Sequence, residues 1–438
     1  MLARLRSFFN PQDERTLPRR IFWAGFLVRV LYMTLAHTYR IRASEDHFQF
    51  GWEAGRIARA LVTGYGYADP FANAYLAHTG PTAWLPPLYP LLMAAIFRLF
   101  GVYTYASAWV LFTIQSAFSA ATALATWEIA ARCFSRRVAL WSAWLWALYP
   151  AAMQYAVRWP WEMTITTALF AFTLVLALRM RSIGSDASPQ PATCNLHPVT
   201  SWLLFGLLWA LIALSNSTLL IFLPICALWI LLPNFHNPHA YLGPIVAALL
   251  FLACIAPWTI RNQRVFHTFI PLRGNLGAEM YMGNGPGSSG LLMEYDHPFQ
   301  SSEQLRLYAA LGEVRYVTMR GTTAKSFIAA HPAHFAADVA RRVYFFWAGV
   351  PQADLAPAVE AGRTLNFVVI SLVGLCGLAL ALRRRIPAAD LFAWTFFLLP
   401  IPYYLVTVHA RFRHPLEPLI CILAVYLFQS AERLKHTV

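Results

Sequence analysis

Residues 44–89 read SEDHFQFGWEAGRIARALVTGYGYADPFANAYLAHTGPTAWLPPLY, and the rest of the chain is arranged around them. They follow the first long apolar run and combine carboxylates, arginines, a Gly64-x-Gly66 turn and the pair Pro86-Pro87. A segment of this composition lies at a membrane surface, with its charged groups in water and its apolar face against lipid. A plain anchor needs neither the acids nor the rigid aromatic turn. We therefore expect a functional site here, just outside a bilayer.

The composition of the whole chain indicates a membrane protein. Of its 438 residues, 58% are hydrophobic and only 12% are charged, and the mean hydropathy is +0.49. A helix that spans a bilayer needs about 20 mostly apolar residues, and the hydropathy accommodates about ten such helices. A β-barrel does not fit, because its strands would alternate apolar and polar residues. We predict an all-α fold: a polytopic membrane helical bundle with interfacial helices in a large first extracytoplasmic loop.

The apolar runs set the expected order of spans. Leu88–Phe100 is too short to cross and Arg98 interrupts it, so we expect an interfacial or re-entrant helix there. Two later runs are short and closely spaced, which favours a helical pair with a tight turn at residues 215–217. The predicted spans are Ile21–Tyr39, Tyr105–Ala131, Val138–Val157, Trp161–Leu178, Trp202–Leu214, Leu219–Leu232, Tyr241–Ile260, Leu365–Leu382, Leu391–Val408 and Leu416–Phe428.

The net charge of +14 comes almost entirely from arginine and indicates topology. Basic residues flank predicted spans, as the positive-inside rule places them at cytoplasmic ends. They form no basic domain, so no nucleic-acid partner is expected. We predict an integral protein of a bacterial-type inner membrane, with its active site on the extracytoplasmic side. The predicted parts are a basic cytoplasmic tail (1–20), a membrane catalytic module (21–270) with an acidic first loop (40–103), an extracytoplasmic segment (271–363), and C-terminal membrane helices with a tail (364–438).

Cysteines and one buried charge add further expectations. The six cysteines are scattered without a Cys-x-x-Cys pair, so neither a zinc site nor a disulfide framework is predicted. No cleavable signal peptide is evident, and the first apolar run should remain as an anchor. Arg29 lies within that run, where a charge is costly and usually faces protein or water. We expect Arg29 to snorkel or to pair structurally.

Three carboxylates are candidates for catalysis. Asp46 and Glu53 are seven residues apart, two turns along one helix face, and Arg56 follows one turn later. Carboxylates beside cations at a membrane surface can act as general bases, although a solvated interfacial helix has the same pattern. Glu162 begins a later span on the same side of the membrane. It is either a second catalytic or metal-binding carboxylate or only a compensation of the helix dipole.

Cations and aromatic rings are predicted on the same face as these acids. The planar fork of arginine suits phosphate, while structural arginines that snorkel are the alternative. A rigid aromatic wall suits a sugar or a lipid headgroup, and it also suits an ordinary interface belt. Residues 283–285, Gly-Asn-Gly, could offer backbone donors to a phosphate or sugar. The substrate-binding candidates are Arg56, Pro87, Tyr89, Arg261, Asn262, Arg411, Arg413 and His414, with His409 and Trp84 beside them.

The order of these motifs resembles the GT-C superfamily of integral-membrane glycosyltransferases. A first span precedes an acid-bearing loop with the Gly-x-Gly turn and PTAWLPPLYP, and PWTIRN and an Arg-x-Arg-x-Pro-Leu-Glu-Pro run follow later. The similarity covers residues 21–430. It is greatest to the branch of dolichyl-phosphate-mannose protein mannosyltransferases and bacterial lipid A aminoarabinose transferases. It implies a multi-span bundle that transfers a sugar from a polyprenyl-phosphate donor at the outer face.

The resemblance also implies roles for single residues. In the family, an acid early in the first loop is the catalytic base. Asp46 corresponds to it as the first Asp after the first span. Judged by its distance from the Gly-x-Gly turn, the acid would fall between Asp46 and Glu53, so Glu53 is the rival. Glu162 is then the second acid. Relatives often carry Arg-Pro after the fifth span, whereas this chain has Asn216-Ser217, which puts a donor contact there in doubt. The phosphate-facing arginines implied by the resemblance are Arg261, Arg411 and Arg413.

The sequence thus predicts a membrane glycosyltransferase with a polyprenyl-phosphate-linked sugar donor and a protein, lipid or glycan acceptor. A direct displacement inverts the anomeric centre, and no nucleophile for a covalent intermediate is evident. No cofactor is implied with certainty, and a divalent metal is compatible with the acids. The alternatives are a polymerase or ligase of lipid-linked glycans and a non-enzymatic transporter of lipid or glycan. A transporter would need polar residues across the midplane of the spans.

Overall fold

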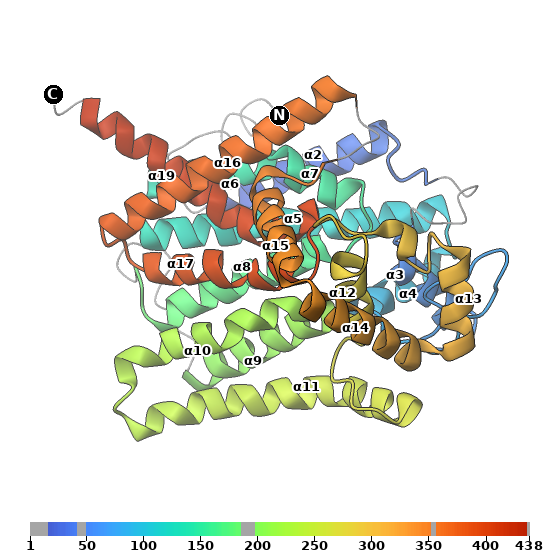
Figure 1. The fold of residues 1–438 in the computed structure, drawn as a ribbon. Coiled ribbons are helices and arrows are strands. Elements are labelled where there is room, and N and C mark those ends of the chain that lie inside the picture. Colours follow the sequence, from blue (N-terminus) through green and yellow to red (C-terminus); the bar gives the residue numbers. More distant parts are fainter. Residues whose placement is uncertain (1–15, 42–49, 185–197, 352–355, 436–438) are drawn as a thin grey trace.

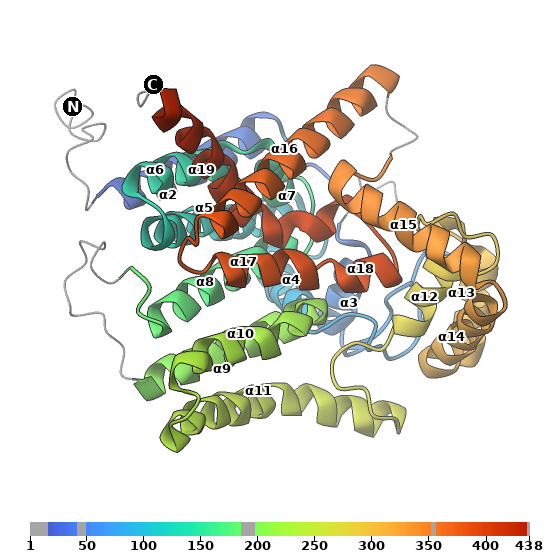
Figure 2. The ribbon, with the colours of Figure 1, turned by 60° about the vertical axis from the view of Figure 1, so that its left-hand side comes forward.

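The computed structural model describes residues 16–41, 50–184, 198–351 and 356–435. Their regular elements are α-helices and short 3₁₀ helices, and an isolated β-bridge joins Ala68 to Pro81. The all-α prediction is therefore confirmed. The long helices run side by side in a bundle, and shorter helices gather at one end of it (Figures 1 and 2).

Seven stretches of the described residues are long and apolar enough to cross a membrane. The first predicted span corresponds to α2 (Leu17–Leu35), which carries three arginines and is not among the seven. The total of about ten crossings remains a prediction, as do the domain boundaries at residues 20, 270 and 363. The seven stretches are Tyr105–Cys133 (α5), Met163–Met180 (α8), Pro198–Ser215 (α9), Ser217–Asn234 (η4, α10 and η5), Pro238–Phe266 (η6 and α11), Pro357–Arg383 (α16) and Ala410–Ala431 (η8 and most of α19).

Two predicted spans are interrupted by proline. Residues 138–157 form α6 (Arg136–Leu148) and α7 (Pro150–Val157), with an extended residue at Tyr149 between them. Residues 391–408 form α17 (Ala389–Leu398) and α18 (Ile401–Leu405), separated by Leu399 and Pro400. Proline lacks a backbone N–H and clashes with the preceding turn. Residues 406–409, which follow α18, are not helical.

The predicted helical pair is present. α9 ends at Ser215, and the Asn216 Oδ1 atom accepts a hydrogen bond of 3.1 Å from the Thr218 amide, which begins η4 (Ser217–Phe222) and then α10 (Leu223–Leu231). α11 (Leu242–Phe266) lies along α9 (Figure 1). A Cβ atom added at Gly206 would lie 2.3 Å from the Ala247 carbonyl oxygen, so only glycine allows α9 and α11 to approach this closely.

Arg29 is fully buried in α2, and its partners are uncharged. Its Nε donates to Ser119 Oγ at 3.0 Å, and its Nη1 donates to the carbonyls of Gly25 at 3.0 Å and Ala147 at 2.6 Å. A fourth bond of 3.3 Å joins Nη2 to the Trp146 carbonyl. Hydrogen bonds to backbone oxygens compensate much of the cost of a buried cation. The structural pairing expected for Arg29 is thus present, and it joins α2 to α5 and to the end of α6.

The short helices come from two distant parts of the sequence. α3 (Trp52–Val62) and α4 (Leu88–Phe100) belong to the first loop, and α4 has the bounds predicted for the interfacial helix. They lie beside the helices of the second loop at the same end of the bundle (Figure 1). The second-loop helices are α12 (Leu276–Asn284), α13 (Ser302–Leu311), α14 (Glu313–Ala330) and α15 (Pro332–Ala348), and the chain then continues through α16, η8 (Ala410–Leu416) and α19 (Glu417–Lys435).

Candidate active site

A cavity of about 510 Å³ opens where the two loops meet the ends of the long helices. Its walls come from the first turn of α3, the turn before α4, the start of α8, the turn after α9, part of the second loop, and the segment between α18 and η8. The cavity therefore collects residues that are up to 361 positions apart, from Gly51 to Phe412. Its size is in the range of small-molecule sites in proteins.

Glu53 lines this cavity from the first turn of α3, which begins after Gly51 with a φ of +92°. The Glu53 Oε1 atom lies 3.2 Å from Nε2 of His297, and both side chains are mostly buried. Burial by itself raises the pKa of Glu53. The hydrogen bond and charge of His297, together with Arg411, lower the pKa further than burial raises it, so the net pKa lies below its usual value. Glu53 is therefore held as a carboxylate.

Glu162 lines the same cavity and is the residue immediately before α8. Its side chain makes no hydrogen bond to the amides of the helix start, and among the described residues no ion pair to it is found. The sequence left open whether Glu162 only compensates the helix dipole. Its carboxylate faces the cavity, where a ligand can reach it.

Arg411 brings a guanidinium group to the cavity from η8. Its Cζ atom lies 4.2 Å from the ring centroid of Trp161 and 5.4 Å from that of Phe412. Within the described part of the chain it makes no ion pair, and its Nε is buried without a hydrogen-bond partner. A guanidinium stacked on rings keeps its N–H edges free for a bidentate anion.

The ring beneath Arg411 belongs to a stack of three tryptophans. Trp161 lies 4.9 Å from Trp159, with the two rings inclined by only 9°, and 5.0 Å from Trp52. Trp52 precedes Glu53 in the chain, and Trp161 precedes Glu162. The stack therefore links the positions of both acids to that of the guanidinium.

His409 lies beside Arg411 in the cavity wall. Burial, with the nearby charges of Arg411 and Arg363, lowers the pKa of His409 to about 3. His409 is the residue before η8, and its Nδ1 accepts a hydrogen bond of 3.2 Å from the Arg411 amide. His409 is thus a neutral imidazole that shapes the loop.

Other predicted substrate-binding residues lie outside the cavity lining. Arg261 donates hydrogen bonds of 2.7 Å to the carbonyls of Thr82 and Tyr67, and so joins α11 to the first loop. The Nδ2 atom of Asn262 donates to the Ile270 carbonyl at 2.9 Å. Both residues hold the C-terminal end of α11 in place, and neither lines the cavity.

Arg413 and His414 are also placed away from the cavity. Both are fully buried. Arg413 Nη1 donates to Ser371 Oγ at 2.7 Å, and Arg413 Nη2 lies 3.4 Å from Glu417 Oε1. His414 Nδ1 lies 2.6 Å from Glu417 Oε2. These contacts tie η8 and the start of α19 to α16.

Of the predicted residues in the first loop, some line the cavity and others make structural contacts. Arg56 is buried, and its Nε donates to the Ala72 carbonyl at 2.6 Å, while its Cζ lies 4.2 Å from the Phe299 ring centroid. Pro87 begins α4 without lining the cavity. Tyr89 lines the cavity, and its hydroxyl donates to Gln115 Oε1 at 2.6 Å. Asp46 lies outside the described residues.

The structure adds cavity residues from the second loop that sequence reasoning missed. His297 is the partner of Glu53. Arg273 Nε donates to the Trp84 carbonyl at 3.1 Å, and its Nη2 lies 3.1 Å from Glu279 Oε1. Glu294 lines the cavity as well. No local sequence motif predicts these residues, because they reach the cavity only through the contact between the second loop and the first.

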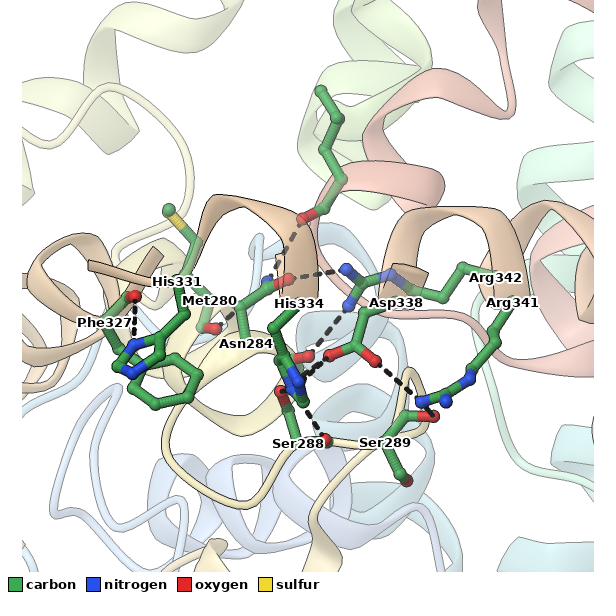
Figure 3. Close-up of polar contacts among 12 residues, drawn as sticks. Met280, Asn284, Ser288, Ser289, Phe327, His331, His334, Asp338, Arg341 and Arg342 are labelled. Atoms are coloured by element: carbon green, nitrogen blue, oxygen red, sulfur yellow. Dashed lines mark hydrogen bonds and ion pairs between the residues drawn. The ribbon is translucent and has the colours of Figure 1, made fainter. Parts of the chain in front are cut away.

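Figure 3 shows how the second loop is joined to the cavity wall, through Arg342 of α15. Arg342 is buried, and it donates to the carbonyls of Tyr404 at 2.8 Å, Gly283 at 2.8 Å and Val406 at 3.0 Å. Asn284 Nδ2 donates to the Leu405 and Val406 carbonyls at 3.1 and 3.2 Å. The Gly-Asn-Gly run, considered as a donor of hydrogen bonds to ligand, thus uses Gly283 and Asn284 to hold the segment after α18.

A second cluster in Figure 3 lies next to Arg342 on α15. The buried carboxylate of Asp338 accepts a hydrogen bond of 2.6 Å from Ser288 Oγ and lies 3.2 Å from Arg341 Nη1 and 3.3 Å from His334 Nε2. These contacts fix the Gly- and Ser-rich turn after α12 onto α15.

A metal ion is a reasonable partner for clustered carboxylates, so we tested whether the acids fit one. In the described ranges, no group of three or more His, Cys, Asp or Glu side chains is arranged to hold a metal ion. The described residues do not form a metal site by themselves. The five cysteines in these ranges are free thiols.

Comparison with solved structures finds the same fold in the oligosaccharyltransferase of Archaeoglobus fulgidus. The apo form matches with a TM-score of 0.53 at 14% sequence identity, over 98% of this chain and 52% of that chain. The form tethered to an acceptor peptide with the NVT sequon gives 0.51 at 13% identity, over 97% and 51%. The complex with Zn and sulfate gives 0.50 at 15% identity, over 94% and 50%.

This chain thus spans about half the length of the oligosaccharyltransferase that it resembles. The likeness shows that this chain shares the fold of that oligosaccharyltransferase, as the resemblance implied, while membership of the GT-C superfamily and of one of its branches stays a prediction. No family model matches the sequence, and no curated protein sequence matches it.

Proposed function

We propose that this protein is a membrane glycosyltransferase that moves a sugar from a polyprenyl-phosphate donor to an acceptor at the extracytoplasmic face. One observation carries the proposal: the carboxylates of Glu53 and Glu162 share a cavity with the guanidinium of Arg411, which makes no ion pair among the described residues and whose Nε lacks a hydrogen-bond partner there. Group transfer from a lipid phosphate needs these two functions, a base for the acceptor and a cation for the leaving phosphate. The fold shared with an oligosaccharyltransferase agrees with this reaction class.

In this proposal the donor phosphate binds Arg411. The guanidinium is stacked on Trp161, and Arg411 lines the cavity. A planar fork binds two phosphate oxygens at once. The polyprenyl chain would lie against the apolar helices that surround the cavity, several of which expose long apolar side chains. Arg273 is already paired with Glu279, so Arg411 is the better candidate for the phosphate.

The chemical step is a single displacement. A carboxylate takes the proton from the acceptor hydroxyl or amine, and the acceptor atom forms a bond to the anomeric carbon. The bond from that carbon to the phosphate oxygen breaks, and polyprenyl phosphate leaves with the electron pair, stabilised by Arg411. The anomeric centre is inverted. Glu162 suits the base because its carboxylate is unpaired among the described residues, Glu53 is the rival, and Asp46 stays a candidate outside them.

The acceptor is proposed to be a protein, lipid or glycan. The structural relative was captured with an acceptor peptide, which makes a peptide a natural first acceptor to test. The same likeness favours one alternative in particular, a ligase that transfers a whole oligosaccharide instead of one sugar. Mass spectrometry of the product separates the two, because it shows whether one sugar or many have been added.

The test uses the full-length protein in detergent with radiolabelled polyprenyl-phosphate sugars. Wild type should transfer label to an acceptor, and Arg411→Gln should lower the rate about 10²–10³-fold, the usual effect of losing one group that stabilises a leaving charge. Arg264→Gln is the matched control, since Arg264 is exposed in the last turn of α11 and does not line the cavity. Transport of a fluorescent lipid without any transfer of label would contradict the proposal.

A further inference from the structure

One wall of the cavity carries only uncharged polar groups. Asn216, Ser217 and Thr218 come from the turn between α9 and η4, and Tyr403 and Thr407 come from α18 and the segment after it. We call these five residues the neutral wall. The other walls hold the charged groups, among them Glu53, Glu162 and Arg411.

Two hydroxyl groups of the neutral wall are buried and unpaired. Tyr403 and Thr407 are 6% and 7% exposed, and among the described residues neither hydroxyl has a hydrogen-bond partner. The polar neighbours of the Tyr403 hydroxyl are the side chains of Asn216 and Thr218, but neither meets hydrogen-bond geometry. A buried polar group without a partner is costly, so native proteins seldom leave one unpaired. Because both residues line the cavity, a ligand there can supply the missing partners.

Asn216 offers a third unused group. Its Oδ1 is occupied by the Thr218 amide at 3.1 Å. Among the described residues, the hydrogen-bond partner of its Nδ2 is the Met163 sulfur, at 4.0 Å, and thioether sulfur is a weak acceptor. Asn216 is 6% exposed, so this donor is buried as well. The neutral wall therefore presents one amide donor beside several hydroxyls that both donate and accept.

This pattern decides which chemistry the wall can bind. A phosphate would require a cation, and the neutral wall contains none. The charges that reach Tyr403 from outside the wall, Glu162 and Arg273, are opposite in sign and favour neither an anion nor a cation. A charged group buried against a wall that has no charge to pair with it is costly. An ammonium group can only donate, and so it cannot accept the Asn216 Nδ2 hydrogen bond. The hydroxyls of a sugar ring both donate and accept, which matches the mixed groups of the wall.

We propose that the neutral wall binds the ring hydroxyls of an uncharged sugar, through Tyr403, Thr407 and Asn216. This inference rests on the proposed function, and it names the class of sugar that the donor carries: a hexose or pentose without a charged substituent. The lipid phosphate then lies on the Arg411 side of the cavity and the sugar on the neutral wall. Tyr403, Thr407 and Asn216 thus determine specificity for the donor.

Other buried hydroxyls provide matched controls. Thr167 in α8 and Tyr426 in α19 are buried, and their hydroxyls also lack partners among the described residues, but neither lines the cavity. A double variant Tyr403→Phe/Thr407→Val removes two hydroxyls from the neutral wall and keeps the shape of both side chains. Tyr426→Phe/Thr167→Val removes the same two groups elsewhere. Comparing the two double variants separates ligand binding from any general effect of removing buried hydroxyls.

The experiment measures the affinity of the full chain in detergent for two probes, polyprenyl phosphate and polyprenyl-phosphate hexose. Wild type should bind the hexose lipid more tightly than polyprenyl phosphate alone. The affinity of the neutral-wall variant for the hexose lipid should fall about tenfold or more, as expected when two hydrogen bonds are lost. Its affinity for polyprenyl phosphate should not change. The control variant should match wild type for both probes. Thermal unfolding of each variant confirms that it is folded.

Several results would overturn the inference. Unchanged hexose-lipid affinity in the neutral-wall variant would do so, and so would an equal loss for both probes. A wild-type preference for a donor with an amino sugar or a uronic acid over the hexose donor would also overturn it, while leaving the proposed transfer reaction intact. If wild type binds neither probe and transfers no label, the proposed function fails and this inference fails with it.

Discussion

Arg411 and Arg413 are two residues apart in η8, yet they belong to opposite kinds of site. Arg413 is fully buried and lies against Ser371 and Glu417, and its neighbour His414 contacts Glu417 as well. Arg411 faces the cavity, stacked on Trp161, with no ion pair among the described residues. Both regions combine acids with cations. In the buried region the charges are matched within the protein, whereas in the cavity Arg411 and Glu162 make no ion pair among the described residues.

The difference shows what distinguishes a structural charge cluster from a site for chemistry. A buried cluster is stable only when its members satisfy one another, because an unpaired buried charge is costly. A binding site needs the opposite, since a group already paired has to exchange its partner before it can hold substrate. Arg261 and Arg342 follow the first pattern through backbone carbonyls, and Arg411 and Glu162 follow the second.

The largest effect is expected from breaking the buried cluster. Glu417→Ala leaves Arg413 and His414 buried without their carboxylate, and such a loss typically costs about 3–5 kcal/mol of stability. The measurement is thermal unfolding of the purified protein in detergent. Glu303→Ala, at an exposed position in α13, should leave the unfolding temperature unchanged. A Glu417→Ala protein as stable as wild type but inactive would place Glu417 in the chemistry and remove the contrast between the two regions.

A smaller effect is expected from the aromatic stack that holds Arg411. Trp161→Leu removes the ring beneath the guanidinium, and the turnover should fall about tenfold, in line with a partly desolvated cation–π contact. Trp161→Phe should restore most of the rate because it returns a ring face. Trp23→Leu, at an exposed tryptophan of α2, is the control. Equal losses for the Leu and Phe variants would show that the stack does not position Arg411.

Much of the architecture could be predicted from the sequence. Hydropathy and the short length of the apolar run predicted α4 with the bounds that the structure shows, and the two short runs around residues 215–217 predicted the α9–α10 pair. Both features are local, since they depend on the length of an apolar segment and on the turn that ends it. The breaks at Pro150 and Pro400 were missed because an apolar run with an internal proline can also continue as a kinked helix.

The site was less predictable, for a physical reason. Arg411 and Arg413 have the same side chain and nearly the same position in the sequence, and only the direction of each in η8 decides which one meets the cavity. His297 became the partner of Glu53 through a contact between two loops that are distant in the sequence. Composition identifies which residue types gather at one end of the bundle. It does not say which of them are already paired.

The smallest expected effect is a shift in the pH dependence of the transfer rate. This shift identifies which carboxylate is the base. The pKa of Glu53 lies below its usual value because His297 and Arg411 outweigh the effect of burial. In His297→Gln the largest lowering influence is gone, so the pKa of Glu53 should rise. If Glu53 is the base, the rate is lost as pH falls through that pKa, and the acid limb of the pH–rate profile moves to higher pH in the variant. If Glu162 is the base, the rate can change but the acid limb stays where it is. The profile for transfer of radiolabel therefore decides whether the paired or the unpaired carboxylate of the cavity accepts the proton.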